Sequence, residues 1–115
     1  MLVIYKILRK TEWEVAKKAA RLDGSPADLA DGYIHFSTHA QLEGTVARHF
    51  AGEEGLVVLA VDTEKLGPSL RWEASRGGLL FPHLYAALQL DQIEWAGSLS
   101  MSDDGAHIIP FDAGN

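Results

Sequence analysis

The sequence contains no cysteine, which excludes disulfide bonds and cysteine-based nucleophilic or metal chemistry. Long apolar stretches are also absent. The apolar residues 1–5 are followed at once by Lys6, and the longest uncharged run, residues 77–90, is shorter than the ~20 residues of a membrane helix. We therefore expect a cytoplasmic protein with no membrane partner.

Basic residues are scarce as well. Ten lysines and arginines face 16 aspartates and glutamates, giving a formal charge of -6. The densest basic pair, Lys17 and Lys18, fits a solvated helix face, whereas nucleic-acid-binding domains usually carry a basic stripe. We expect no nucleic-acid partner. The 115 residues suffice for a single domain, residues 1–115, with a loose tail from about residue 101.

Familiar catalytic and phosphate-binding motifs are missing too. The sequence has no P-loop, no GxGxxG, no GxSxG and no HExxH. The pair Gly77-Gly78 is most simply a turn. Any activity must therefore depend on residues that the fold brings together.

Apolar periodicity and capping signals predict two helices, both in the first half of the chain. One begins at Thr11, with a Thr11/Glu14 capping box, and the other spans residues 39–50, with a Thr38/Gln41 capping box. Residues 24–32 are predicted to form a loop. The predicted strands are residues 2–8, 33–37, 56–61, 70–75, 92–99 and 107–111, with residues 81–87 left as strand or turn. This order favours an α+β fold with a mixed or antiparallel sheet.

The stretch "DGYIHFST" places a histidine in the middle of a strand. Because side chains alternate along a strand, Ile34 and Phe36 point to one face and His35 to the other, together with Tyr33 and Ser37. The first face suits a core. We therefore predict that the face carrying His35 lines a cleft.

Two later stretches have the same two-sided character. In "LRWEAS", Glu73 alternates with apolar neighbours, and in "FPHLY", His83 shares a face with Tyr85 if the segment is extended. The three strands together predict one cleft that contains His35, Glu73 and His83 as catalytic residues.

Structural roles remain open for each of these residues. A buried histidine is often only hydrogen-bonded, and Glu73 next to Arg71 fits a surface ion pair. Packing at the core edge explains His39 and His49 on the second helix. A metal set of Glu73 and histidines 35, 39 and 83 is an alternative, but without an HExxH or HxH motif we expect no metal.

The segments "IYKI", "DGYIHFST" and "RWEAS…GG…FPHLY", in this order, resemble the mostly bacterial domain-of-unknown-function family 952. The resemblance spans residues 4–99. It implies an ADP-ribosyltransferase-like fold, in which a split, mostly antiparallel sheet with two helices in the first half surrounds a cleft for NAD. NAD or a related nucleotide would then be substrate and small-molecule partner.

The resemblance also implies roles for individual residues. Lys6 stands where such proteins usually carry histidine or arginine on the first strand, and His35, Ser37 and Thr38 occupy the second position. Glu73, at the third, would stabilise positive charge on the ribose during transfer or hydrolysis of ADP-ribose. Ser37 and Thr38 would hold phosphate, and Trp72 or Tyr85 would stack on a flat ring. A catalytically silent ligand-binding module is the alternative, and the oligomeric state is left open.

Overall fold

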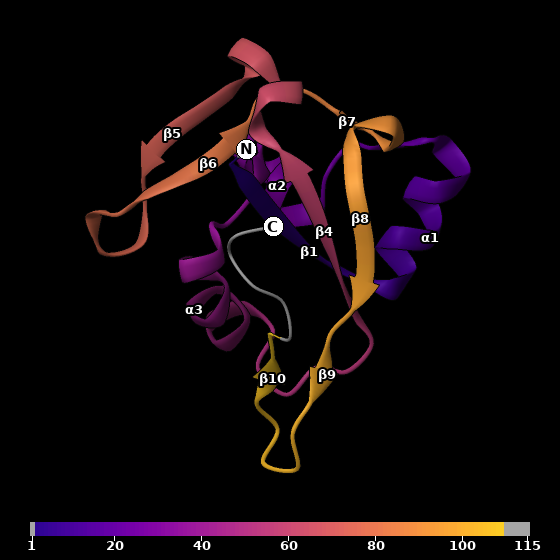
Figure 1. The fold of residues 1–115 in the computed structure, drawn as a ribbon, viewed down its shortest axis with the longest axis vertical. Coiled ribbons are helices and arrows are strands. Elements are labelled where there is room, and N and C mark those ends of the chain that lie inside the picture. The colour runs from indigo at the N-terminus through magenta and orange to yellow at the C-terminus, as the bar shows by residue number, and fades with distance from the viewer. Residues whose placement is uncertain (1, 110–115) are drawn as a thin grey trace.

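The structure, a computed structural model, describes residues 2–109. It is a mixed α+β fold, and every strand pairing among these residues is antiparallel, so the predicted α+β class and mostly antiparallel sheets are confirmed (Figure 1). No helix in the described part of the chain is both long and apolar enough to span a membrane.

The first sheet has the order β1-β4-β8, with β1 at Val3–Arg9, β4 at Leu56–Asp62 and β8 at Ile93–Ser98. The continuously apolar β4 lies in the centre, because a strand covered on both faces needs no polar side. Strand β1 pairs with β4 along its whole length, from Val3 opposite Asp62 to Arg9 opposite Leu56.

The second sheet has the order β3-β6-β5, with β3 at Ile34–His35, β6 at Leu80–Leu84 and β5 at Leu70–Ala74. The segment 81–87, which the sequence left undecided, is therefore a strand as far as Leu84, and residues 85–87 lie outside any strand. An isolated bridge joins the two sheets, in which the backbone N–H groups of Tyr5 and Ser37 each donate to the other's carbonyl at 2.8 Å.

Two short ribbons complete the strand pairing. One pairs β2 (Arg21–Leu22) with β7 (Leu88–Gln89), and the other pairs β9 (Ser100–Met101) with β10 (His107–Ile108). The predicted last strand thus begins at His107, while its end at residues 110–111 lies outside the described residues. Single 3₁₀ turns occupy Thr63–Lys65, Gly67–Ser69, Arg76–Gly78 and Leu90–Gln92.

Helices α1 (Lys10–Ala19) and α3 (His39–His49) match the two predicted helices. The Thr38/Gln41 capping box of α3 is confirmed, with reciprocal contacts of 3.3 and 3.0 Å. The predicted cap of α1 is wrong. Because β1 runs directly into α1, Arg9 is the N-cap, and its backbone N–H donates to Glu12 at 2.8 Å.

Between these helices lies α2 (Pro26–Asp31), where the sequence predicted a loop. That prediction is wrong for a local reason. Ser25 and Asp28 form a capping box, and Pro26 occupies the first turn, where its missing N–H costs nothing. Gly32 ends the helix in the left-handed region, at φ 87°.

The core forms one layer on each face of the first sheet. Alternation along β1 sends Ile4 and Leu8 into the layer that includes Phe36, the residue after β3, and Tyr5 and Ile7 into the layer against α3. Lys6 shares the face of Ile4 and Leu8, yet only 5% of its surface is exposed. A lysine at such a place requires a partner.

Candidate functional site

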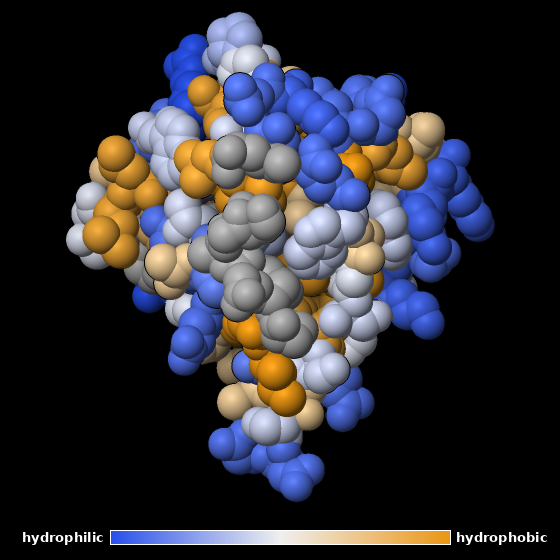
Figure 2. All heavy atoms as spheres, in the orientation of Figure 1, coloured by the Kyte–Doolittle hydropathy of each residue, from blue (hydrophilic) through white to orange (hydrophobic). Residues whose placement is uncertain are grey.

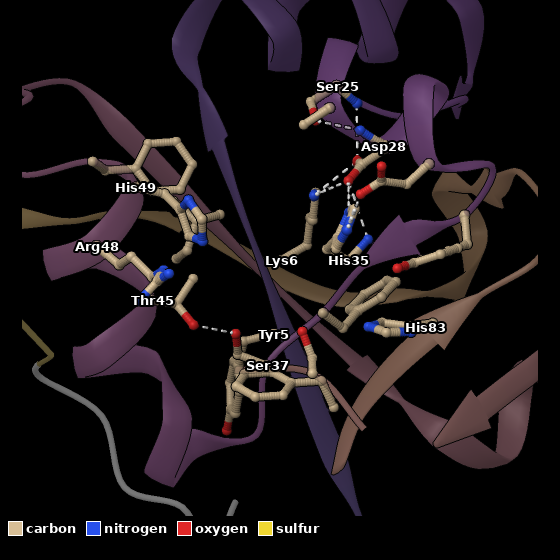
Figure 3. Close-up of a pocket in the computed structure, with 18 of the residues that line it drawn as sticks. Tyr5, Lys6, Ser25, Asp28, His35, Ser37, Thr45, Arg48, His49 and His83 are labelled. Atoms are coloured by element: carbon tan, nitrogen blue, oxygen red, sulfur yellow. Dashed lines mark hydrogen bonds and ion pairs between the residues drawn. The ribbon is translucent and has the colours of Figure 1, made fainter. Parts of the chain in front are cut away.

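A cavity of about 650 Å³ is lined by β1, α2, β3, α3 and β6, near the bridge between the two sheets (Figure 3). In Figure 3, Asp28, His35 and His83 lie on one side of β1, and Thr45, Arg48 and His49 of α3 lie on the other. We call these the α2 end and the α3 end of the cavity.

Asp28 of α2 holds the α2 end together. Its carboxylate lies 2.8 Å from Lys6 Nζ and accepts hydrogen bonds from the backbone N–H groups of Ser25 and His35 at 2.9 and 3.1 Å. The same carboxylate lies 2.6 Å from His35 Nδ1. Asp28 thereby joins α2, β1 and β3 at one buried point, with 2% of its surface exposed.

The electrostatics of this buried group follow from its partners. Burial alone would raise the pKa of Asp28, but the hydrogen bond from His35 and the charge of Lys6 outweigh it and hold the pKa well below its ordinary value. Burial lowers the pKa of Lys6, and the adjacent Asp28 opposes that shift. The pair therefore sits inside the protein as matched charges.

His35 contacts carboxylates through both ring nitrogens. Nδ1 faces Asp28, and Nε2 lies 2.9 Å from the carboxylate of Asp31, whose side chain is half exposed. Since a carboxylate only accepts hydrogen bonds, the ring satisfies both contacts when both of its nitrogens carry protons. An anionic ligand group would have to displace the exposed Asp31 to reach Nε2.

His83 is the second imidazole at the α2 end of the cavity and is 3% exposed. Its Nδ1 lies 2.8 Å from Glu73 Oε1, which also accepts a 2.7 Å hydrogen bond from the hydroxyl of Tyr85. The hydrogen bonds from Tyr85 and His83 lower the pKa of Glu73. The hydrogen bond between Tyr85 and Glu73 in turn raises the pKa of Tyr85. With Nδ1 engaged, Nε2 is the nitrogen of His83 that remains for a ligand.

The two histidines are direct neighbours across strands, because His35 of β3 pairs with His83 of β6. Their ring centroids are 5.5 Å apart, and Tyr33 contacts both, at 4.6 Å from His35 and stacked at 4.1 Å on His83. Two imidazoles, each held by a carboxylate, therefore share one wall of the cavity with an aromatic ring.

The α3 end has a different composition. The hydroxyls of Ser37 and Thr45 lie 2.7 Å apart, and Arg9 is held by Glu53 at 2.8 Å. Arg48 and His49, both exposed, complete this end. The expectation that His49 packs at the edge of the core is therefore wrong, because this side chain is exposed and lines the cavity.

The predicted site residues are only partly gathered by the fold. Lys6, His35, Ser37 and His83 line the cavity. Glu73 does not line it and instead holds His83 from outside. Tyr33, which the alternation placed on the face of His35, lines it as well, and so do three residues that sequence reasoning overlooked, namely Asp28, Asp31 and Arg48.

The remaining predicted ligand contacts lie elsewhere. Tyr85 borders a smaller hollow of about 270 Å³ that shares Asp28 and Tyr33 with the main cavity. Thr38 caps α3, and Trp72, 39% exposed, points away from Glu73 along its strand; neither is among the residues that line the cavity.

The histidines and Glu73 do not form a metal set. Within residues 2–109, no three His, Asp or Glu side chains are grouped so that they could hold a metal ion. His39 instead meets Tyr5 edge to face at 6.1 Å.

Comparison with known proteins gives the family but no activity. Residues 7–96 match the family described as "Protein of unknown function (DUF952)", and no curated protein matches the chain. The crystal structure of protein CC0527 from Caulobacter crescentus is 47% identical, with a TM-score of 0.89 over 93% of this chain and 94% of that chain. The solution NMR structure of CC0527 is 48% identical, with a TM-score of 0.83 over 92% and 91%. On this evidence the chain belongs to the DUF952 family.

Proposed function

We propose that the cavity binds NAD or a related nucleotide, and that the chain has an ADP-ribosyltransferase-like fold. The observation that carries the proposal is the cross-strand pair His35 and His83, held by carboxylates and packed on Tyr33 at the wall of a large cavity. Ligand sites commonly combine such polar groups with aromatic surface in cavities of roughly 300–1,000 Å³. A nucleotide, with flat rings, sugar hydroxyls and phosphates, matches this mixture.

The same geometry supports a chemical role for His83. Glu73 orients the ring through Nδ1, so Nε2 is available as a general base. In ADP-ribosyl transfer the bond between nicotinamide and ribose breaks, and its electron pair leaves with nicotinamide. The acceptor oxygen then bonds to the ribose, and its proton passes to Nε2 of His83.

Glu73 has a different role in this proposal from the one expected from the sequence. Because it does not line the cavity and its carboxylate holds His83 and Tyr85, it acts through His83 and not on the ribose. It is a positioning residue.

A catalytically silent binding module is the second candidate, and a specific observation favours it. Lys6 occupies the first position of the expected transferase pattern. Its ammonium group already forms a buried ion pair with Asp28 and so is not available to a ligand. A protein built this way would bind the nucleotide without turning it over.

Titration with NAD, ADP-ribose and nicotinamide, followed by the histidine NMR signals, tests binding. We expect shifts at His35 and His83, and a loss of about two- to tenfold in affinity in His83→Gln, since a hydrogen bond between uncharged groups contributes about 0.5–1.5 kcal/mol. His107→Gln is the matched control, because His107 does not line the cavity. If the signals of His35 and His83 do not change at saturating ligand, the cavity does not bind these nucleotides and the proposal is wrong.

Turnover then separates the two candidates. Release of nicotinamide from NAD, slowed in both His83→Gln and Glu73→Gln but not in the control Glu94→Gln, supports the enzyme. Glu94 lies on β8 and pairs with Lys65 at 2.6 Å, away from the cavity-lining residues. Binding with no turnover at any enzyme concentration supports the silent module.

A further inference from the structure

The two ends of the cavity differ in how their charges are matched. At the α2 end each cationic or imidazole side chain faces a carboxylate: Lys6 faces Asp28, His35 faces Asp28 and Asp31, and His83 faces Glu73. The acidic residues that line the cavity, Asp28 and Asp31, both belong to this end. The α2 end therefore offers hydrogen bonds and ring surface, but little net positive charge.

At the α3 end the matching is incomplete. Arg9 is paired with Glu53, its Nε 2.8 Å from the carboxylate, and its guanidinium lies 5.0 Å from the Phe50 ring centroid. For Arg48, in contrast, no carboxylate of the described residues lies within ion-pair distance, and no acidic residue lines this end. An arginine without a carboxylate at the wall of a cavity is unexpected in a protein with a formal charge of -6.

Neighbouring groups at this end suit the same kind of ligand. His49 follows Arg48, and the hydroxyl pair Ser37 and Thr45 lies on the same side of β1 as Arg48 (Figure 3). A guanidinium presents several N–H donors in a planar fork, which matches the oxygens of a phosphate group. Hydroxyls and an imidazole add further donors around such a group.

From this asymmetry we propose that the α3 end is a phosphate subsite, in which Arg48 is the specificity-determining residue for phosphorylated ligands. The inference rests on the proposed function, and it names the ligand class: nucleotides with a phosphate or diphosphate group, whose ring or sugar extends to Tyr33 and the two histidines. Arg48 binds the charge and takes no part in bond breaking.

The helix itself supplies an alternative reason for a basic residue here. Arg48 and His49 lie in the last turn of α3, where the helix dipole favours positive charge. That effect stabilises the helix in the absence of any ligand, so it predicts that Arg48 contributes to stability and not to ligand affinity. Binding and unfolding measurements on one variant distinguish the two roles.

The test compares adenosine, AMP, ADP-ribose and inorganic pyrophosphate by calorimetric titration against wild type and Arg48→Gln. We expect Arg48→Gln to bind AMP, ADP-ribose and pyrophosphate about tenfold more weakly, the usual size of a lost charge-assisted hydrogen bond, and adenosine as wild type does. Arg21→Gln is the matched control, because Arg21 lies on β2, pairs with Asp23 and does not line the cavity.

The outcomes separate this inference from the nucleotide proposal. Equal affinity of wild type and Arg48→Gln for every phosphorylated ligand overturns the phosphate subsite while the nucleotide proposal stands. A third outcome is that pyrophosphate binds in a way that depends on Arg48, while adenosine does not bind and the nucleoside part of AMP adds no affinity. That outcome supports the phosphate subsite and overturns the nucleotide proposal. Absence of binding by all four compounds overturns both.

Discussion

The two three-stranded sheets share a connection at Tyr5 and Ser37, but they are built differently. In the first sheet, β1 and β4 are buried on both faces. In the second, only one face enters the core, and the other carries Glu73, His83 and Tyr85. Figure 2 shows that apolar and polar side chains also mix on the outer surface of the molecule. The first sheet supplies much of the buried core, and the second carries titratable side chains that are hydrogen-bonded to one another.

Lys6 is the exception to this division, since it is a charged group inside the first sheet. Asp28→Ala would leave its charge buried without a partner, so we expect a loss of about 3–5 kcal/mol in the free energy of unfolding. Urea denaturation measures this loss.

The double variant Lys6→Met with Asp28→Asn is the control. It removes the charges and keeps one oxygen. That oxygen can serve only one of the two N–H groups, because Ser25 and His35 donate to different oxygens of Asp28, so only part of the stability should return. Equal stability of wild type and Asp28→Ala would show that Asp28 does not hold Lys6.

The same substitution in each sheet tests the comparison directly. Leu59 of β4 is fully buried, whereas Leu80 of β6 is 56% exposed. We expect Leu59→Ala to lower the free energy of unfolding by about 2–5 kcal/mol. Leu80→Ala should change it by less than about 0.5 kcal/mol. Similar losses in the two variants, measured by thermal or urea unfolding, would contradict the assignment of the buried core to the first sheet.

Low pH should weaken the contacts that Asp28 makes with β1 and β3. The pKa of Asp28 is lower in the folded protein than its ordinary value of 3.8, so its contribution to stability is complete at neutral pH. That contribution is lost as the pH falls below about 4 and towards the folded-state pKa. We expect wild type to lose more stability between pH 7 and pH 3 than Asp28→Asn, which has no group to protonate. Parallel pH profiles of the two proteins would count against this account.

The smallest expected effect concerns the second sheet alone. Tyr85→Phe removes one of the two hydrogen bonds to Glu73 and leaves the bond to His83. The pKa of Glu73 should therefore rise towards its ordinary value, with little change in stability, because both side chains are partly exposed. Carboxyl NMR signals followed against pH report this shift, and an unchanged pKa would mean that Tyr85 does not influence Glu73.

Local signals in the sequence were sufficient for most of the fold. The apolar run of β4 and the alternation around His35 are patterns within a few residues, and both predictions are confirmed. The short helix α2 was equally local, since Ser25, Pro26 and Asp28 are start signals, but the surrounding glycines favoured a loop.

The arrangement of the site was not local. Asp28 and Lys6 are 22 residues apart, and their pairing depends on how α2 lies against β1. Strand alternation placed Glu73 on the correct side of β5, but it could not show that His83 stands between Glu73 and the cavity. Arg48 carries no motif, so only the fold identifies it.

The pairing of β1 with β4 also determines the order in which the molecule can fold. Val3 meets Asp62, so the first sheet requires closure of a loop that contains both β3 and α3. The β5–β6 hairpin closes over a few residues and can form in about 1–10 μs, whereas folds with non-local strand pairs commonly take milliseconds to seconds. We expect stopped-flow refolding to show this slow phase, with the cavity complete only when it ends. A chain emerging from the ribosome carries His35 well before β4 and β6, so the site exists only after the later half of the chain has been made.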